Sequence, residues 1–374
     1  MEKVLLTSIC RPKQWKTIST KDLLESGYPV YGANGKIGFY NSYTHEHPTV
    51  LITCRGATCG SINISDPKSY VNGNAMALDN LSEEVDLYYL KYYLEYRKLD
   101  DIISGSAQPQ ITGKGLSKVK IPLPPLDQQK KIAAILDAAD AYRQKTKALI
   151  EKYKELTQSL FLDMFGDPVT NPKGWDKLIL SSCFISKKEG TKCGPFGSAL
   201  KKHEYVDNGI PVWTMYNIKA DGFNENKCLF ITPEKYDDLA SYETKFGDII
   251  ISRAGTIGKM CVVTYAKKAI ISTNLIRLRL DTEKILPMYF SLLMNKWGPK
   301  IARLKTGADG SFTHMNTGIL NGIVLSVPPL ELQNQFAERV QAIEAQKAQA
   351  QASLAQAEDL FNSLLQRAFK GELS

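Results

Sequence analysis

Two stretches of the chain carry apolar residues in alternating steps of three and four positions. This repeat averages 3.5 residues, which is typical of the a/d seam of a coiled coil, and no proline interrupts either stretch. We therefore expect two helices of about 36 residues, or about 54 Å each, that pair antiparallel. For each stretch the alternative is an amphipathic helix lying on its own domain. The first seam consists of Ile135, Ala139, Tyr142, Thr146, Leu149, Tyr153, Leu156 and Leu160, and the second of Phe336, Val340, Ile343, Lys347, Ala350, Leu354, Ala357, Phe361 and Leu364.

The rest of the chain is patterned as short strands. Apolar runs such as Thr49–Thr53 and Asp248–Ser252 are separated by glycine, asparagine and proline, which indicates strands and turns. Each strand-rich region ends at a Pro-Pro-Leu sequence, directly before a helical stretch. The pattern predicts an α+β fold in which two β-rich domains alternate with two long helices. The predicted boundaries are 1–122 and 166–326 for the domains, and 123–165 and 327–374 for the helices.

Four short motifs occur twice in the same order, so the chain consists of two similar halves. The offset between the copies rises from 160 residues at the first motif to 204 at the last. The second half therefore contains insertions, within 187–203 and 217–244, and such loops are where binding diversity usually lies. The pairs are Pro12-Lys-Gln-Trp15 with Pro172-Lys-Gly-Trp175, Gly27-Tyr-Pro-Val30 with Gly209-Ile-Pro-Val212, Arg55-Gly-Ala-Thr-Cys-Gly60 with Arg253-Ala-Gly-Thr-Ile-Gly258, and Pro124-Pro-Leu126 with Pro328-Pro-Leu330.

The charge balance favours a polyanionic partner. The 374 residues include 47 Lys and Arg against 39 Asp and Glu, a formal net charge of +8. Basic side chains that neutralise phosphates release condensed counterions, so this balance suits nucleic acid. There is no run of about 18 apolar residues and no signal-peptide pattern, so we expect a soluble cytoplasmic protein that does not bind membranes.

The sequence lacks the motifs of common catalytic and metal sites. The seven cysteines are scattered without a C-x-x-C pair and there are only four histidines, so we expect reduced thiols and no zinc site. No N-P-P-F or D-P-P-Y segment for methyl transfer to a base occurs, and Gly113-Lys114 lacks the first glycine of a P-loop. We therefore expect no catalytic residue, no cofactor and no bound metal.

A further set of motifs lies around the predicted helices. They are Tyr28-Pro-Val-Tyr-Gly-Ala-Asn-Gly35, Gly105-Ser-Ala-Gln108, Ile121-Pro-Leu-Pro-Pro-Leu-Asp-Gln-Gln129, Met164-Phe-Gly-Asp-Pro168 and Asn171-Pro-Lys-Gly-Trp175. With the alternation of domains and helices, this ordered set resembles the specificity subunit of type I restriction–modification systems over essentially the whole chain. The second half departs from the pattern, with Gly307-Ala-Asp-Gly310 for Gly-Ser-Ala-Gln and Ser326-Val-Pro-Pro for Pro122-Leu-Pro-Pro.

The resemblance implies a DNA-binding subunit without catalytic machinery. Each β-rich domain is expected to be a target-recognition domain that reads one half of a bipartite DNA site, and the helices are expected to set the gap. The expected partners are double-stranded DNA, two modification (methyltransferase) subunits that dock on the helices, and restriction (endonuclease/translocase) subunits held through them. Because the insertions change the loops of the second half, we expect two different half-sites.

Turns of the first half carry candidate DNA contacts. An arginine follows an apolar strand and opens a turn whose glycines would let backbone amides approach a phosphate, with a threonine hydroxyl as a further donor. Glutamines in a polar loop could bond adenine bidentately. A structural turn, a flexible loop and a plain hairpin are the alternatives for these segments. The candidates are Tyr31, Asn34, Lys36, Arg55, Thr58, Gln108, Gln110 and Lys114.

The second half offers a parallel set. Its arginine turn repeats that of the first half, and several lysines lie in the inserted loops, where a solvated charged face is the alternative reading. The candidates are Lys192, Lys201, Lys202, Arg253, Thr256, Lys259, Asn274, Ser311 and His314. Two other functions remain open from sequence: a coiled-coil scaffold that binds only protein, and an orphan DNA-binding relative of the same family.

Overall fold

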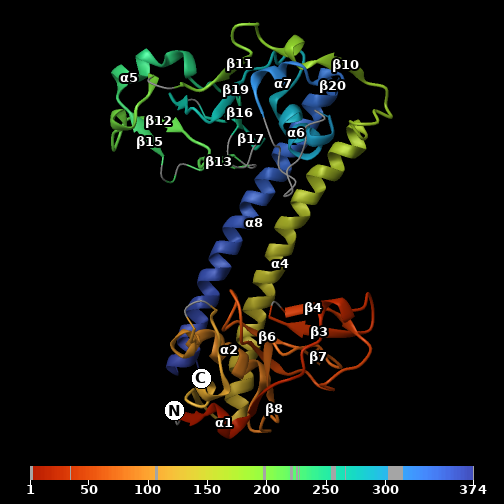
Figure 1. The fold of residues 1–374 in the computed structure, drawn as a ribbon, viewed down its shortest axis with the longest axis vertical. Coiled ribbons are helices and arrows are strands. Elements are labelled where there is room, and N and C mark those ends of the chain that lie inside the picture. Colours follow the sequence, from red (N-terminus) through yellow and green to blue (C-terminus); the bar gives the residue numbers. More distant parts are fainter. Residues whose placement is uncertain are drawn as a thin grey trace. The chain divides into compact units, whose positions relative to one another are not determined.

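The computed structural model describes residues 3–33, 35–105, 108–196, 199–219, 222–224, 226, 228–253, 258–265, 267–301 and 315–373. The chain divides into two compact units. Unit 1 comprises Met1–Ile150 and Ala348–Ser374, and unit 2 comprises Glu151–Lys347. Each unit contains one β-rich body and a part of each of two long helices, α4 and α8 (Figure 1).

The long helices begin and end at residues that the sequence marks clearly. α4 spans Leu126–Phe165 and α8 spans Leu330–Lys370, so each starts directly after a Pro-Pro pair and exceeds the expected length by a few residues. The backbone N–H of Gln129 donates to the Pro125 carbonyl, and that of Gln333 donates to the Pro329 carbonyl. Proline fits this position because its fixed φ suits the start of a helix and its missing N–H is not needed there.

Glycines in the left-handed conformation follow both helices. Gly166 (φ 75°) comes directly after α4, and Gly371 (φ 85°) directly after α8. Only glycine adopts this conformation without a steric penalty, so both helices stop where the sequence provides one.

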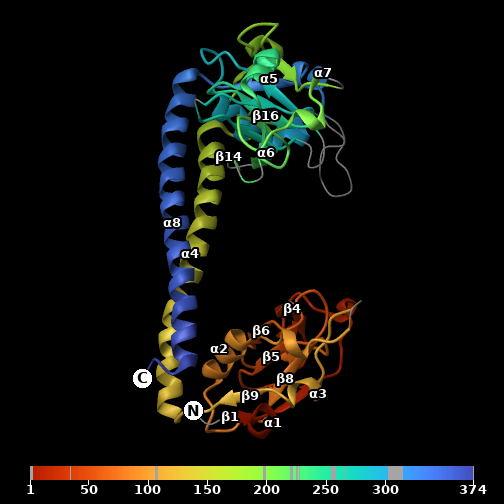
Figure 2. The same cartoon turned by 90° about the vertical axis from the view of Figure 1, so that its left-hand side faces the viewer.

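The two long helices pair antiparallel, as the sequence predicts. In unit 1 the Lys147 Nζ lies 3.3 Å from a Glu358 carboxylate oxygen, and the Arg143 guanidinium lies 3.8 Å above the centre of the Phe361 ring. In unit 2 the rings of Phe161 and Phe336 meet edge to face, 5.7 Å apart. In unit 1 the partner's residue number falls from 361 to 358 as that on α4 rises from 143 to 147, and within each unit α4 and α8 lie side by side in both views (Figures 1 and 2).

The seam of α8 is confirmed, whereas the predicted seam of α4 is half wrong. Every predicted α8 position is buried or half-buried. Between positions 134 and 160 of α4 the buried residues are Leu136, Thr146, Ile150 and Thr157. Thr146 is a predicted seam residue, whereas the other three each lie one position after a predicted one. Four predicted seam residues are exposed instead, at 41%, 54%, 42% and 48% for Ile135, Tyr142, Leu149 and Leu156. The remaining three are half-buried, namely Ala139, Tyr153 and Leu160. The true seam contains two threonines and a half-buried arginine, Arg143, which hide its apolar periodicity.

Unit 1 contains two small sheets and a helix that covers one of them. The antiparallel sheet has the order β2-β8-β5-β6, and the second sheet has the order β4-β3-β7. β1 pairs with β9 beside them. The strands are β1 Lys3–Leu5, β2 Arg11–Gln14, β3 Tyr28–Gly32, β4 Gly35–Tyr40, β5 Val50–Thr53, β6 Ile62–Ile64, β7 Tyr70–Val71, β8 Ala75–Asp79 and β9 Lys120–Pro122, and the short helices are α1 Leu6–Ile9, α2 Leu87–Arg97 and α3 Gly113–Leu116.

Unit 2 repeats this plan with insertions. The antiparallel sheet has the order β11-β19-β16-β17 and the second sheet the order β15-β12-β18, while β10 pairs with β20 and β13 with β14. The strands are β10 Asp176–Ile179, β11 Thr191–Cys193, β12 Ile210–Trp213, β13 Ile218–Lys219, β14 Gly222–Phe223, β15 Leu229–Ile231, β16 Ile249–Ser252, β17 Met260–Val262, β18 Ile270–Ile271, β19 Leu275–Leu278 and β20 Val324–Val327, and the helices are α5 Pro233–Asp238, α6 Pro287–Ile301 and α7 Thr317–Asn321.

The central strands explain why the two bodies fold alike. All four residues of β5 and all four of β16 are buried, as expected for apolar runs covered on both faces. Each pairs on one side with the strand that follows an asparagine, Asn74 before β8 and Asn274 before β19. The internal duplication seen in the sequence is therefore a duplication of one sheet scaffold.

Candidate nucleic-acid interface

Each β-rich body has one edge at which parallel strands end together. In unit 1 the parallel strands β3 and β7 place Tyr31 opposite Val71, and in unit 2 β12 and β18 place Trp213 opposite Ile271. The chain leaves both strands of each pair at the same edge, where polar turns gather. Ligands of sheet proteins commonly bind beyond such carboxyl ends, so these edges are the candidate sites.

In unit 1 this edge brings together two turns that the sequence singled out. The carbonyl oxygen of Ala33, in the turn after β3, accepts hydrogen bonds from the Thr53 hydroxyl at 2.7 Å and the Thr58 hydroxyl at 3.2 Å. The backbone N–H of Cys54 donates to the Asn74 carbonyl, which belongs to the turn after β7. The turn that contains Arg55 is thus fixed between the ends of the parallel strands.

The glutamine loop joins the same edge. Arg55 and Gln110 form a backbone bridge, and the N–H of Gly56 donates to the Pro109 carbonyl at 3.3 Å. Gly56 has φ 92°, a conformation that a side chain would strain, so the turn needs glycine there. Several exposed polar and basic side chains of unit 1 therefore lie on neighbouring segments, and we call this group the unit 1 edge cluster: Lys36, Arg55, Thr58, Gln108, Gln110 and Lys114.

Two of the first-half candidates fall outside this cluster. Tyr31 is only 8% exposed, and its hydroxyl accepts a hydrogen bond from the backbone N–H of Asp66 at 3.2 Å. Burial raises the pKa of Tyr31, so its ring is part of the core and offers almost no surface to a ligand. Asn34 lies outside the described residues. Lys36 is exposed, with its ammonium 4.6 Å from the centre of the Phe39 ring.

A buried thiol lies under the arginine turn. Burial raises the pKa of Cys54, while a hydrogen bond from the Gln14 amide and the charge of Arg55 oppose that shift. The Gln14 Nε2 lies 2.9 Å from the Cys54 sulfur and also donates to the Gly73 carbonyl at 3.0 Å. Gln14 therefore ties the end of β2 to the same edge. The thiol stays neutral and serves packing rather than chemistry.

In unit 2 the equivalent edge collects Arg253, Lys259 and Asn274. The N–H of Arg253 donates to the Asn274 carbonyl at 3.0 Å, and Lys259 pairs through its backbone with Ser252. The Arg253 guanidinium lies 5.2 Å from the centre of the exposed Phe196 ring. Its Nη1 is buried and has no hydrogen-bond partner among the residues that the structure describes. The fold thus leaves this donor unused, and the Arg253 side chain must move before the nitrogen can reach an acceptor such as a phosphate or a base edge.

The arginines of the two repeated turns are not structurally equivalent. The N–H of Cys54 donates to Asn74, and the N–H of Arg253 donates to Asn274, so Arg253 occupies the position of Cys54. The turn closes through Gly60 to Thr53 in the first half and through Gly258 to Ser252 in the second. The second turn is therefore one residue shorter. Aligning Arg55 with Arg253 by sequence consequently pairs two residues that are one position apart in the structure. Arg55 is exposed, whereas Arg253 is half-buried.

Other second-half candidates are not brought to the edge by any contact in the described part of the chain. Lys192 lies on β11 with its ammonium 4.9 Å from the centre of the Tyr242 ring. Lys201 and Lys202 are exposed at a short helical turn, where Glu204 pairs with Lys235. The remaining candidates Thr256, Ser311 and His314 lie outside the described residues.

The sequence interpretation missed an exposed tyrosine at the unit 2 edge. Tyr216 is 78% exposed and lies in the turn directly after β12. Asn217 next to it is fully buried: its Oδ1 accepts from the N–H and the hydroxyl of Thr214, and its Nδ2 donates to the Asn224 carbonyl at 2.9 Å. This turn therefore holds a large aromatic side chain in solvent. Only the knowledge that residues 214–217 form a turn would have pointed to it.

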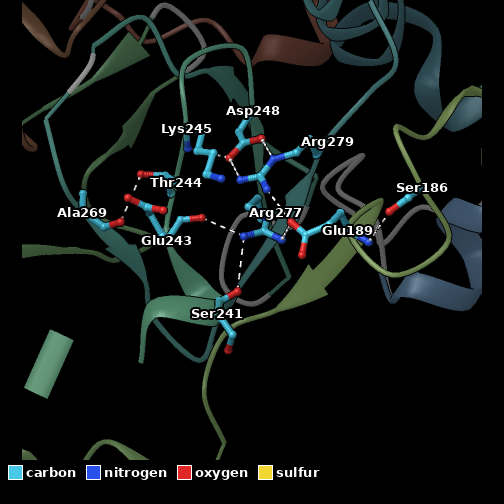
Figure 3. Close-up of polar contacts among 10 residues, drawn as sticks. All are labelled: Ser186, Glu189, Ser241, Glu243, Thr244, Lys245, Asp248, Ala269, Arg277 and Arg279. Atoms are coloured by element: carbon cyan, nitrogen blue, oxygen red, sulfur yellow. Dashed lines mark hydrogen bonds and ion pairs between the residues drawn. The ribbon is translucent and has the colours of Figure 1, made fainter. Parts of the chain in front are cut away.

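A buried charged network anchors the inserted segments of unit 2 to β19 (Figure 3). The Arg279 guanidinium contacts both carboxylate oxygens of Asp248, at 2.7 and 2.9 Å, and also contacts Glu189. Arg277, 2% exposed, donates to the Glu243 carbonyl at 2.7 Å. The hydrogen bond with Asp248 raises the pKa of Arg279, whereas burial lowers that of Arg277.

This network is specific to the second half. β8, the counterpart of β19, carries Ala77 and Asp79 where β19 and the residue after it carry Arg277 and Arg279. In unit 1 Asp79 instead contacts His45, with 2.9 Å between Oδ1 and Nε2. The same scaffold position thus carries a carboxylate, Asp79, in unit 1 and a guanidinium, Arg279, in unit 2, and each contacts a different loop.

Among the residues that the structure describes, no helix combines the length and the apolar character needed to cross a membrane. In the same part of the chain, no three His, Cys, Asp or Glu side chains are grouped to hold a metal ion.

Comparison with known proteins identifies one family. The family model described as the type I restriction modification DNA specificity domain matches residues 1–155 and 195–358. A putative type I restriction enzyme specificity subunit of Haemophilus influenzae is 25% identical over 333 residues, covering 86% of this chain and 81% of the relative. The EcoKI specificity subunit of Escherichia coli K12 is 24% identical over 387 residues, covering 97% of this chain and 77% of the relative.

Solved structures share the fold. The S subunit of a type I restriction–modification system from M. genitalium matches with a TM-score of 0.63 at 17% identity, covering 98% of this chain and 95% of the other. A chain from a structural study of complex assembly in a type I R-M system matches with a TM-score of 0.55 at 16% identity, covering 100% and 98%. At these identities the likeness concerns the fold.

Proposed function

The chain belongs to the type I restriction–modification DNA specificity family, and from this premise we propose that each of its β-rich domains reads one half of a bipartite DNA target. The duplicated edge carries this proposal. In both units the same scaffold presents basic and amide side chains beyond the ends of parallel strands, from turns tied together by backbone hydrogen bonds. Lysine and arginine suit phosphates, while glutamine and asparagine suit the edges of adenine.

The proposed division of labour follows the predicted boundaries. Residues 1–122 and 166–326 form the two target-recognition domains, and 123–165 and 327–374 form the spacer helices that set the gap. The two half-sites differ in sequence, because unit 2 has inserted loops, a shorter arginine turn and the charged network around Arg277. An asymmetric bipartite target is the expected result.

The long helices also provide the docking surface for two methyltransferase subunits, which in turn hold restriction subunits. α4 exposes Ile135, Tyr142 and Leu149 at exact seven-residue spacing within unit 1, so they form one apolar stripe on the outside of the helix pair. Amphipathic helices of a partner bind such stripes, in the manner of a coiled coil that gains a further strand.

The chain itself has no catalytic role in this proposal. The purified chain, supplied with S-adenosylmethionine, ATP, Mg²⁺ and duplex DNA, is expected to produce neither methylated nor cleaved DNA. Turnover by the single chain, free of partner subunits, would contradict the assignment.

A salt-dependent gel shift tests DNA binding against the alternative of a scaffold that binds only protein. A DNA reader loses affinity steeply with salt, with a logarithmic slope of about −0.9 per phosphate contacted. Arg55→Ala is expected to weaken binding, with Arg11→Ala as the matched control. Arg11 is an exposed arginine on β2 opposite Asp79, at the far end of the same sheet from Gln14 and Arg55. Equal losses in both variants, or no binding by the parent chain, would favour the scaffold.

Arg253→Ala tests the second domain in the same assay. A phosphate contact predicts a similar loss on all sequences and a salt slope lower by about one, whereas a base contact predicts relaxed specificity of about 1–3 kcal/mol at one position. Unchanged affinity, slope and specificity would return Arg253 to a structural role.

A further inference from the structure

One glutamine near the start of each long helix has no exposed surface. Gln129 of α4 and Gln333 of α8 are both 0% exposed, and both end the repeated sequence Pro-Pro-Leu-x-x-Gln. A buried amide must use its donors and its acceptor within the protein, since each unpaired group carries a desolvation penalty. The partners of these amides therefore show what the repeated motif does.

In unit 1 the amide of Gln129 joins α4 to the segment before α2. Its Oε1 accepts a hydrogen bond from the backbone N–H of Asp86 at 2.9 Å. Its Nε2 donates to the carbonyl oxygens of Glu84 at 2.9 Å and Pro124 at 2.8 Å. One side chain thus ties the first turn of the long helix to the residue that caps the helix of the β-rich body.

In unit 2 the amide of Gln333 repeats this arrangement. Its Oε1 accepts from the backbone N–H of Leu286 at 2.8 Å, directly before α6. Its Nε2 donates to the carbonyl oxygens of Lys284 at 3.3 Å and Pro328 at 2.8 Å. Three groups are satisfied by a single amide at the same place in both halves.

A tyrosine reinforces each joint. The Tyr89 hydroxyl on α2 donates to the Pro122 carbonyl at 2.8 Å, and the Tyr289 hydroxyl on α6 donates to the Ser326 carbonyl at 2.8 Å. Both carbonyls lie just before the Pro-Pro pair, so the chain is held on either side of the prolines. The joint between each β-rich body and its following helix is therefore closed by buried side-chain hydrogen bonds rather than by a free linker.

We propose that Gln129 and Gln333 are positioning residues that lock each β-rich domain onto the first turn of the following helix and so make the gap between half-sites a sharply defined length. This inference rests on the proposed function, because it assigns the glutamines to the accuracy of the gap and not to the reading of bases. Neither residue touches DNA in this account.

The geometry of DNA explains why the joint must be stiff. One extra base pair in the gap moves a half-site by about 3.4 Å along the duplex. It also rotates the half-site by about 35°, because about ten base pairs complete a turn. A domain that could swing on its helix by such amounts would accept several gap lengths. A locked joint accepts one.

Selection from a pool of fully randomised DNA duplexes, followed by sequencing, tests the inference with the purified full chain. The parent chain should enrich two sequence blocks at one dominant gap. Gln129→Met and Gln333→Met should enrich the same blocks with the gap spread over neighbouring lengths, so that the preference for the dominant gap falls by about tenfold or more. The matched controls are Gln128→Met and Gln335→Met, which change neighbouring glutamines on the same helices.

The outcomes separate the inference from the proposed function. Two blocks with an equally narrow gap in the glutamine variants would overturn the inference and leave DNA reading intact. An equal spread in the control variants would overturn it as well. If the parent chain enriches no paired blocks, the proposed function fails, and the gap role fails with it.

Gln333→Glu keeps the test decisive if the methionine variants do not fold. A carboxylate can still accept from the Leu286 N–H but meets the carbonyl oxygens of Pro328 and Lys284 without a proton to donate. Protonation restores one donor, so lowering the pH should narrow the gap distribution again. The parent chain should show the same gap distribution at every pH. If the distribution of the Gln333→Glu variant also stays the same as the pH falls, the proposed joint is contradicted.

Discussion

Tyr216 is the residue at which exposure is hardest to explain without a ligand. An aromatic ring that is 78% exposed gains nothing from the fold, yet the buried Asn217 holds its turn through three side-chain hydrogen bonds. In a duplex such a ring can make an apolar contact with a base edge, and disturbing one base pair of a specific site costs about 1–3 kcal/mol. We expect Tyr216→Ala to weaken binding to duplexes that contain the second half-site by about tenfold or more, measured by gel shift, while Tyr216→Phe keeps most of the affinity.

Phe246→Ala provides the control. Phe246 is 75% exposed but precedes β16, so it lies at the opposite end of the strand from Arg253. The Phe246→Ala variant should bind DNA with the same affinity as the parent chain. Equal affinity of the Tyr216→Ala and parent chains would remove Tyr216 from the interface.

The Arg279–Asp248 pair makes a prediction about stability. Asp248 is 1% exposed, and removal of its partner would leave a buried carboxylate without its strongest contact. Breaking a buried pair in this way costs about 3–5 kcal/mol, so Arg279→Met should lower the free energy of unfolding of unit 2 by that amount in urea titrations. The double variant Asp248→Asn with Arg279→Met should recover most of the loss. No recovery would show that Arg279 acts mainly through Glu189.

Because the apolar stripe of α4 is exposed, its role in partner binding can be tested without disturbing the fold. Tyr142→Ser with Leu149→Ser should leave the thermal stability of the chain nearly unchanged, because both side chains are exposed, at 54% and 42%. The same variant should lose affinity for the methyltransferase subunit in a pull-down or calorimetric titration. Ile150→Ser, which changes a side chain only 7% exposed, should instead lower the melting temperature. Retained methyltransferase binding by the double serine variant would move the docking surface elsewhere.

The same stripe shows how far periodicity can predict a helix seam. On α8 the apolar and small residues coincide with the buried positions, so the sequence pattern suffices. On α4 a coiled coil accepts Thr146 and Thr157 because their hydroxyls donate to the carbonyls of Tyr142 and Tyr153, four residues earlier. Polar residues inside the seam and apolar residues outside it displace the apparent repeat by one position.

The site was predictable as a set of turns but not as an arrangement. Arg55 and Thr58 belong to one motif and Gln110 to another, and the hydrogen bond from Gly56 to Pro109 brings the two segments together. The Thr58 hydroxyl also ties the arginine turn to Ala33. Burial of Tyr31 depends on how its strand pairs, which its own turn motif does not reveal. The one-residue difference between the arginine turns is likewise visible only in the hydrogen-bond register.

In the whole molecule the scaffold is duplicated, whereas the loops of the two halves differ. The strand order, the Pro-Pro-Leu-x-x-Gln joint and the antiparallel helices are repeated, whereas the loops at the two edges differ in length, charge and aromatic content. A repeated frame with unlike edges suits a protein that reads two unlike sequences at one fixed separation. The helices should therefore set the length of the gap, and the joints at Gln129 and Gln333 how sharply it is defined.

Lengthening both helices by the same amount tests whether they set the gap. One heptad is inserted directly after Lys147 in α4 and another directly before Glu358 in α8, two residues that pair at 3.3 Å, so that the seams stay in register. Seven residues add about 10 Å of helix. This length corresponds to about three base pairs at 3.4 Å each.

The measurement is the sequencing of randomised duplexes enriched by the parent and lengthened chains. Both chains should enrich the same two blocks, and the gap of the lengthened chain should be longer by about three base pairs. Affinity should fall, because three base pairs also rotate one half-site about the DNA axis. An unchanged gap at full affinity, or a change in either block, would contradict the claim that the domains read the sequence and the helices set the distance.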